Sequence, residues 1–167
     1  GTSAQTISAN ITNATGNGAA RSITTSNANG VTFSGLIDLE QAGTTGTTGF
    51  TVSSGSATLN GATSKLTHAS TDFFTVATGS TLNLGHATGA LTGSMVLAGT
   101  GVVNLGANLS TLTGSFSSGA GASTIQTTLI SATTTGKLTP AGAATIAATT
   151  KVHVTVPTTV GVADGQR

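Results

Sequence analysis

Asp38 and Glu40 are the closest pair of carboxylates in the chain, and they are the first residues that could do chemistry. In a strand, both side chains would point to the face opposite Ile37 and Leu39. Such a pair can share general acid–base work or supply oxygen ligands to Ca²⁺. Calcium needs roughly six to eight oxygens, and Asp72 could join the pair only through folding. We therefore expect a solvated strand face, with no catalytic or metal-binding residue.

The three histidines, His68, His86 and His153, are widely separated in the sequence. A zinc site would need three or four ligands converging from separate segments. His86 lies in a predicted Gly-rich turn, and His153 alternates with Val152 and Val154, so its side chain should point away from their face. The chain has no Cys, which excludes thiolate metal sites, cysteine nucleophiles and disulfides. The sequence therefore predicts no metal and no cofactor.

Two Gly-rich tripeptides, Gly-Asn-Gly at 16–18 and Gly-Thr-Gly at 99–101, superficially resemble phosphate-binding loops. Neither has the lysine or the following helix that such a loop needs, so both are predicted to be turns. No Gly-x-Ser-x-Gly elbow is present, so the many serines lack a nucleophile signature. A Ser-His-Asp assembly created by folding stays open, but the sequence favours a protein that is not an enzyme.

Threonine clusters at 44–48 and 133–135 are candidates for O-glycosylation. Asn10, Asn13 and Asn108 begin Asn-x-Ser/Thr sequons, which chance alone would produce in a chain so rich in Asn and Thr. Flat arrays of threonine can also bind ice, but the sequence shows no regular Thr-x-Thr ladder. These motifs suit an extracellular protein without identifying a ligand.

The composition excludes several classes of partner. Charged residues are 5% of the 167 residues, against about 25% in an average soluble domain. The net charge is +1 and aromatic residues are 3%, so the chain lacks the basic surface for nucleic acid and the stacking platforms for bases or sugars. No apolar run approaches the roughly 18 residues that span a bilayer. The length fits a single all-β domain over 1–167.

Apolar residues alternate with polar ones in short segments along most of the chain, which is typical of strands with one buried face. Turn-forming Gly and Asn separate the segments, which recur about every ten residues between positions 31 and 116. The alternating apolar positions are Ile7, Ala9, Ile11, Val31, Phe33, Ile37, Leu39, Phe50, Val52, Ala57, Leu59, Phe74, Val76, Leu82, Leu84, Met95, Leu97, Val103, Leu105, Leu112, Phe116, Val152, Val154 and Val156.

These segments predict a right-handed parallel β-helix, a solenoid of about 25 residues per coil. Residues 79–85, 93–99 and 101–106 are variants of one small strand-and-turn unit. Three such units fill one coil, and small aliphatic side chains suit a narrow stacked core. The alternative is an antiparallel β-sandwich that exchanges strands between subunits, because it uses strands and turns of similar length.

Residues 87–116 resemble the passenger repeats of bacterial autotransporter adhesins, including rickettsial surface antigens. Those repeats have the form Gly-x-Gly-x-Val-x-Leu-x-Gly, and Gly99, Gly101, Val103, Leu105 and Gly106 supply a variant with the last Gly one position early. Residues 29–35 are similar to another version of the repeat. The resemblance implies a parallel β-helix on a bacterial surface. The chain is shorter than such passengers and has no C-terminal barrel, which predicts an assembling unit or a fragment.

The terminal segments 5–12 and 151–156 alternate cleanly, and a free terminal strand can complete the open edge of a neighbouring subunit. The alternative is that they are the first and last strands of a closed domain. We expect an extracellular structural protein, a subunit of a cell-surface fibre or adhesin that associates head to tail with itself and contacts host or cell-surface glycans. A carbohydrate-binding or carbohydrate-cleaving β-helix is the alternative function.

Overall fold

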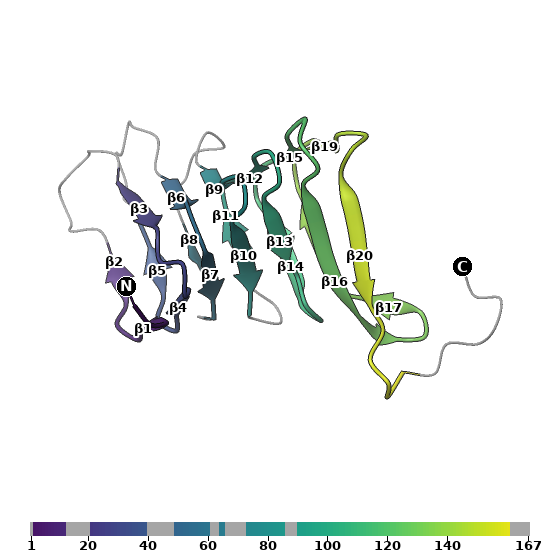
Figure 1. The fold of residues 1–167 in the computed structure, drawn as a ribbon, viewed down its shortest axis with the longest axis horizontal. Coiled ribbons are helices and arrows are strands. Elements are labelled where there is room, and N and C mark those ends of the chain that lie inside the picture. Colours follow the sequence, from purple (N-terminus) through teal and green to yellow (C-terminus); the bar gives the residue numbers. More distant parts are fainter. Residues whose placement is uncertain are drawn as a thin grey trace.

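The computed structural model describes residues 2–12, 21–39, 49–60, 64–65, 73–85 and 90–160. Within these ranges the chain forms strands and turns but no helix. The strands stack in parallel along the long axis of the molecule, with β1 and β20 at opposite ends (Figure 1). This arrangement confirms the predicted parallel β-solenoid and excludes the antiparallel sandwich.

Three sheets, named A, B and C, run the length of the solenoid. Sheet A contains, in spatial order, β1 (Gln5–Ile7), β4 (Val31–Phe33), β7 (Ser56–Leu59), β10 (Thr81–Leu84), β13 (Val102–Asn104), β16 (Thr124–Ser131) and β17 (Thr134–Thr135), and β20 (Lys151–Thr155) also pairs with β16. Sheet B contains β2 (Ile11–Thr12), β5 (Ile37–Asp38), β8 (Ser64–Lys65), β11 (Ala90–Thr92), β14 (Leu109–Leu112) and β18 (Lys137–Pro140). Sheet C contains β3 (Ser22–Thr25), β6 (Gly49–Val52), β9 (Phe73–Val76), β12 (Ser94–Leu97), β15 (Phe116–Ser118) and β19 (Ala144–Thr145).

Equivalent residues of successive coils lie side by side, because each strand up to β13 pairs with the strand three elements later, and β14, β15 and β16 pair with the strand four elements later, since β17 is inserted. Gln5 aligns with Val31 and Val31 with Ala57, which gives about 26 residues per coil. The coils are shorter in the middle of the chain, where Thr81 aligns with Val102. The one antiparallel pair among the described strands joins β17 to the end of β16. The observed coil length agrees with the predicted value of about 25 residues.

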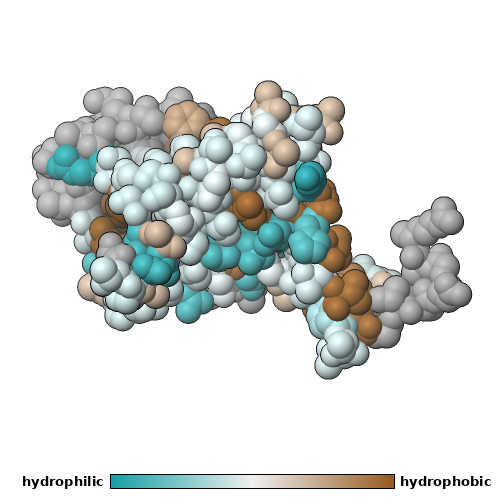
Figure 2. Space-filling model, viewed as in Figure 1, coloured by the Kyte–Doolittle hydropathy of each residue, from teal (hydrophilic) through white to brown (hydrophobic). Residues whose placement is uncertain are grey.

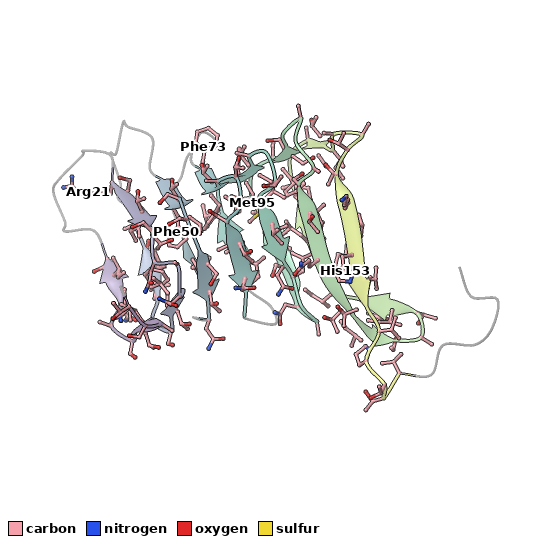
Figure 3. All side chains as sticks on the ribbon, viewed as in Figure 1. Arg21, Phe50, Phe73, Met95 and His153 are labelled. Atoms are coloured by element: carbon pink, nitrogen blue, oxygen red, sulfur yellow. The ribbon has the colours of Figure 1, made fainter. Side chains whose placement is uncertain are left out.

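Inward-pointing residues of the three sheets fill a narrow apolar core. In sheet C they form one continuous row: Ile23, Phe50, Phe74, Met95, Phe116 and Ala144. Phe50 and Phe74 are fully buried, and their ring centroids lie 6.2 Å apart. The rings of Phe33 in sheet A and Phe50 pack edge to face, with their centroids 5.4 Å apart. Figure 3 shows Phe50 and Met95 pointing into the space between the sheets. The core is therefore a narrow apolar stack, but along sheet C it is filled by Phe and Met side chains instead of the small aliphatic ones expected from the sequence.

Glycines allow the chain to turn sharply where coils touch. Gly99 has a φ of +53°, in the left-handed region that favours glycine, and it lies in the turn between β12 and β13. Gly121 lies against it in the next coil, and a Cβ on Gly121 would come within 2.4 Å of the Cα of Gly99. No real side chain tolerates such a contact with backbone. The spacing of coils at this corner therefore requires glycine at both positions.

The N-terminal segment 5–12, expected as one terminal strand, is divided between two sheets. It forms β1 in sheet A and β2 in sheet B, with a corner between them. The backbone N–H of Ser34 donates to the carbonyl of Ile7, and the N–H of Leu36 donates to Oδ1 of Asn10. These two hydrogen bonds hold this corner against the equivalent corner of the next coil. The C-terminal segment agrees better with its prediction, because β20 covers all but the last residue of the expected strand 151–156.

Candidate functional site

Of the carboxylate pair Asp38 and Glu40, only Asp38 lies within the described residues. Asp38 lies half-buried in β5, between the buried side chains of Ile37 and Leu39, as alternation predicted. Its Cα neighbours in adjacent coils are Thr12 and Lys65. Glu40 and Asp72 lie outside the described residues. No carboxylate is therefore seen to join Asp38 in the part of the chain that the structure describes.

Of the three histidines, only His153 is described, and His68 and His86 lie outside the described ranges. His153 is the exposed middle residue of β20 and aligns with Gln126 of β16 (Figure 3). It belongs to the row that faces away from the core, whereas Val152 faces the interior, as alternation predicted. No group of three or more His, Cys, Asp or Glu that could hold a metal ion occurs among the described residues.

The Gly-Thr-Gly sequence at 99–101 is a tight turn, and several of its polar groups are hydrogen-bonded within the protein. The N–H of Gly101 donates to the carbonyl of Ala98 at 2.8 Å, and Oγ1 of Thr100 accepts from the N–H of Gly79 at 3.0 Å. A Cβ on Gly101 would lie 2.7 Å from the carbonyl oxygen of Val76. The predicted turn at 99–101 is therefore confirmed, and it packs one coil against the next. The Gly-Asn-Gly sequence at 16–18 lies outside the described residues.

Two of the candidate glycosylation sequons are described, and in both the asparagine side chain bonds to backbone. Asn108 is half-buried and donates from Nδ2 to the carbonyl of Leu84. Asn10 is exposed and accepts from Leu36 at 2.9 Å through Oδ1. A glycan on Asn108 would replace one hydrogen of a donor that holds two coils together, so Asn10 is the more accessible acceptor. Asn13 and the threonine cluster at 44–48 lie outside the described residues.

The other threonine cluster, at 133–135, is partly used inside the fold. Oγ1 of Thr135 lies 2.7 Å from Oγ1 of Thr127, a buried hydroxyl that also donates to the carbonyl of Gly136 at 2.7 Å. Thr133 and Thr134 are exposed at the tip of the β16–β17 hairpin. Of this cluster, only these two hydroxyls are therefore presented to solvent without a described structural role.

The most regular polar feature is a row of outward-facing residues that runs the full length of sheet A, here called the outer row. Its members are Thr6, Thr32, Thr58, Asn83, Asn104, Gln126 and His153. Nδ2 of Asn104 donates to Oδ1 of Asn83 at 3.0 Å, and Nδ2 of Asn83 is 3.3 Å from Oγ1 of Thr58. Oδ1 of Asn104 accepts from the N–H of Gly106 at 3.0 Å. These hydrogen bonds fix the middle of the row as a rigid strip.

A second row of outward-facing side chains, all of them small and polar except Val96, runs along the outside of sheet C. Thr24, Thr51 and Thr75 are aligned in consecutive coils, and Val96, Ser117 and Thr145 continue the row. Sequence reasoning found no regular ladder, because these threonines are spaced by whole coils instead of by two residues. The coil length varies from 26 residues between Gln5 and Val31 to 21 between Thr81 and Val102, so a search for one fixed period would not have aligned either row completely. Figure 2 shows a largely pale surface that is crossed at its middle by a band of hydrophilic side chains, with only isolated apolar spots beside it.

The two ends of the solenoid carry the described hollows. One hollow, of about 410 Å³, lies at the β1 end and is lined by Ile7, Ile11, Ile23, Val31 and Phe33, with polar residues from 24 to 27. The other, of about 280 Å³, lies at the β20 end and is lined by apolar residues that include Phe116, Ile125, Leu138, Ile146 and Val152. Brown patches in Figure 2 mark the apolar surface near β17 and β20. Both hollows are unfinished ends of the core, and neither gathers acidic or basic side chains from several strands.

A search for membrane-crossing segments among the described residues found no helix of sufficient length and apolar character. The chain was also compared with protein-family models, with curated proteins and with solved structures, and none of them matches it.

Proposed function

We propose that this chain is a non-enzymatic, extracellular structural protein, the rod-like part of a cell-surface fibre or adhesin that acts through its neutral polar surface. The observation that carries the proposal is the outer row of sheet A, from Thr6 to His153. It aligns seven side chains along the axis of the rod, and its central amides are hydrogen-bonded to one another.

The physical character of this surface supports a structural role. Five of the 167 residues are Lys or Arg and four are Asp or Glu, so neighbouring rods would not repel one another strongly. Hydroxyl and amide groups keep the surface hydrated, and the stacked coils make it stiff along its axis. Few Lys, Arg and aromatic side chains leave few cleavage sites for common proteases. Each of these properties favours persistence outside the cell.

The resemblance of residues 87–116 to autotransporter passenger repeats points to the same setting. Residues 90–116 supply strands β11 to β14 and the start of β15, so they contribute to all three sheets. The Gly-x-Gly-x-Val element of that resemblance contains the tight turn at 99–101 and the buried Val103. The motif therefore corresponds to one corner and one strand of a coil.

Two measurements test this proposal together. Negative-stain microscopy of the purified chain is expected to show filaments or rods of uniform width. Antibody labelling of intact cells of the source organism, with and without surface protease treatment, is expected to detect the chain outside. Labelling that requires permeabilised cells would contradict the proposed location, and globular particles at every concentration would contradict the fibre.

Carbohydrate recognition is the second candidate, because the hydroxyl and amide groups of the outer row are donors and acceptors that sugar hydroxyls can pair with. Binding of soluble glycans that is lost in Asn83→Ala together with Asn104→Ala would favour a glycan-binding module. Loss of glycan cleavage in Asp38→Asn and Glu40→Gln would favour an enzyme. Filaments that bind no glycan favour the structural role alone.

A further inference from the structure

One edge of β20 has no partner strand among the described residues. β20 pairs in parallel with β16, and no other described strand pairs with it. All five of its residues are exposed, including the apolar side chains of Val152 at 65% and Val154 at 44%. An exposed apolar edge strand presents unpaired N–H and C=O groups, which makes it a template for another strand.

The opposite end of sheet A presents the matching edge. β1 pairs with β4 and with no other described strand. Ile7 is 36% exposed and lines the hollow at this end. β1 carries no charged residue, and β20 carries only Lys151 and His153, so the two edges bear no like charges against each other. Among the described strands, each end of sheet A therefore lacks one neighbour.

The register of the sheet shows what would complete both edges. An inward-facing row, here called the inner row, runs unbroken from one end to the other through Gln5, Val31, Ala57, Leu82, Val103, Ile125 and Val152. β1 and β20 thus point in the same direction and in the same phase. A second copy displaced along the axis brings its β1 to the free edge of β20 as the next parallel strand. Gln5, Thr6 and Ile7 of that copy then follow Val152, His153 and Val154.

We propose that β20 is the docking strand for β1 of a second copy of this chain, so that sheet A continues from one molecule into the next. The contact is heterologous, because different edges meet, and it therefore propagates into a filament instead of closing as a dimer. The hollows at the two ends open toward each other across this junction. This inference rests on the proposed fibre function and specifies the contact that builds the fibre.

A pair of engineered cysteines tests the geometry directly, because the chain has no cysteine of its own. Thr6→Cys and His153→Cys place thiols on neighbouring outward positions of the two copies. Adjacent strands lie about 4.8 Å apart, within the Cα separation of roughly 4.4–6.8 Å that a disulfide spans. Under mild oxidation, the double variant is expected to give a ladder of covalent oligomers on non-reducing gels.

The single cysteine variants are the matched controls. In head-to-tail docking, the cysteine of Thr6→Cys in one molecule lies far from the same cysteine in the next molecule, and the same holds for His153→Cys. Neither single variant should therefore give more than background dimer. Efficient dimerisation of His153→Cys alone would overturn the proposal in favour of tail-to-tail pairing. A double variant that stays monomeric on the gel would overturn it as well.

A charge on the docking edge provides a second, independent test. Val154→Lys places an ammonium beside Ile7 of the incoming copy, where pairing would desolvate it, so the Kd of self-association should rise by about tenfold or more. Thr111→Lys adds the same charge to an exposed position of β14 in sheet B and should leave the Kd unchanged. Sedimentation velocity measures both, and circular dichroism checks that each variant keeps its β structure.

The outcomes separate this contact from the proposed function. If Val154→Lys forms filaments as readily as the wild type, the β20–β1 contact is wrong while the structural role stands. If the wild-type chain stays monomeric at every concentration, both the contact and the fibre role fall. If filaments form, Val154→Lys abolishes them and the double cysteine variant gives the ladder, both are supported.

Discussion

The side-chain amide of Asn104 donates a hydrogen bond to that of Asn83, which occupies the equivalent position one coil earlier, at 3.0 Å. The same side chain accepts the N–H of Gly106, so it joins the outer row to the following corner. A hydrogen bond of this kind contributes about 0.5–1.5 kcal/mol net. The outer row is thus a source of stability as well as a surface.

Asn104→Ala should therefore lower the free energy of unfolding by about 1–2 kcal/mol, because it removes both hydrogen bonds. In a chain of this size, each kcal/mol corresponds to a fall of about 2–4 °C in Tm. Thr111→Ala changes an exposed residue of β14 and should leave Tm nearly unchanged. Thermal unfolding followed by circular dichroism compares the two, and equal effects would show that the amide row does not stabilise the fold.

Phe73 and Phe74 provide a matched test of the core, because they are adjacent in β9 and point to opposite faces. Phe74 is fully buried, whereas Phe73 is 39% exposed and projects outward (Figure 3). Phe74→Ala should cost about 3–5 kcal/mol through lost burial and the cavity left behind, and Phe73→Ala much less. Urea unfolding monitored by far-ultraviolet circular dichroism measures both variants. A comparable loss for the two would mean that β9 lies in the opposite phase.

Gly121→Ala should destabilise the solenoid strongly, because the added methyl group would lie 2.4 Å from the Cα of Gly99 in the previous coil. The backbone cannot move away without opening the corner between sheets C and A. Gly49→Ala is the control: the nearest atom to its Cβ is a carbonyl oxygen at 3.8 Å, an ordinary contact. Alanine in the strand at position 49 should be neutral or stabilise by up to about 1 kcal/mol. Unfolding midpoints that fall equally would refute the close packing of Gly121 on Gly99.

The alternation of side chains predicted most of the core, including Phe50, Phe74 and Met95, because a period of two is set by strand geometry alone. The stacking of one coil on the next was not predictable in the same way. Its spacing is about 26 residues at the N-terminal end and shorter between Thr81 and Val102, so no fixed period aligns Asn83 with Asn104. Alternation also concealed the corner between β1 and β2, because Ile7, Ala9 and Ile11 continue the pattern through a bend.

Ser80 and Ser123 provide opposite predictions for the same substitution. Both side chains are fully buried, but Oγ of Ser80 has no hydrogen-bond partner among the described residues, whereas Oγ of Ser123 lies 3.2 Å from Oγ1 of Thr150. A buried hydroxyl without a partner costs about 1–3 kcal/mol, and alanine removes that cost while keeping nearly the same volume.

Ser80→Ala should therefore raise the free energy of unfolding by about 1 kcal/mol, and Ser123→Ala should lower it by a similar amount because Thr150 loses a partner. Thr150 keeps its contact with Oγ of Ser118 at 2.7 Å, which limits the loss. Chemical denaturation of both variants beside the wild type measures the two signs. A fall in stability for Ser80→Ala would show that its hydroxyl is paired in solution, since only a lost interaction could outweigh the relief of desolvation.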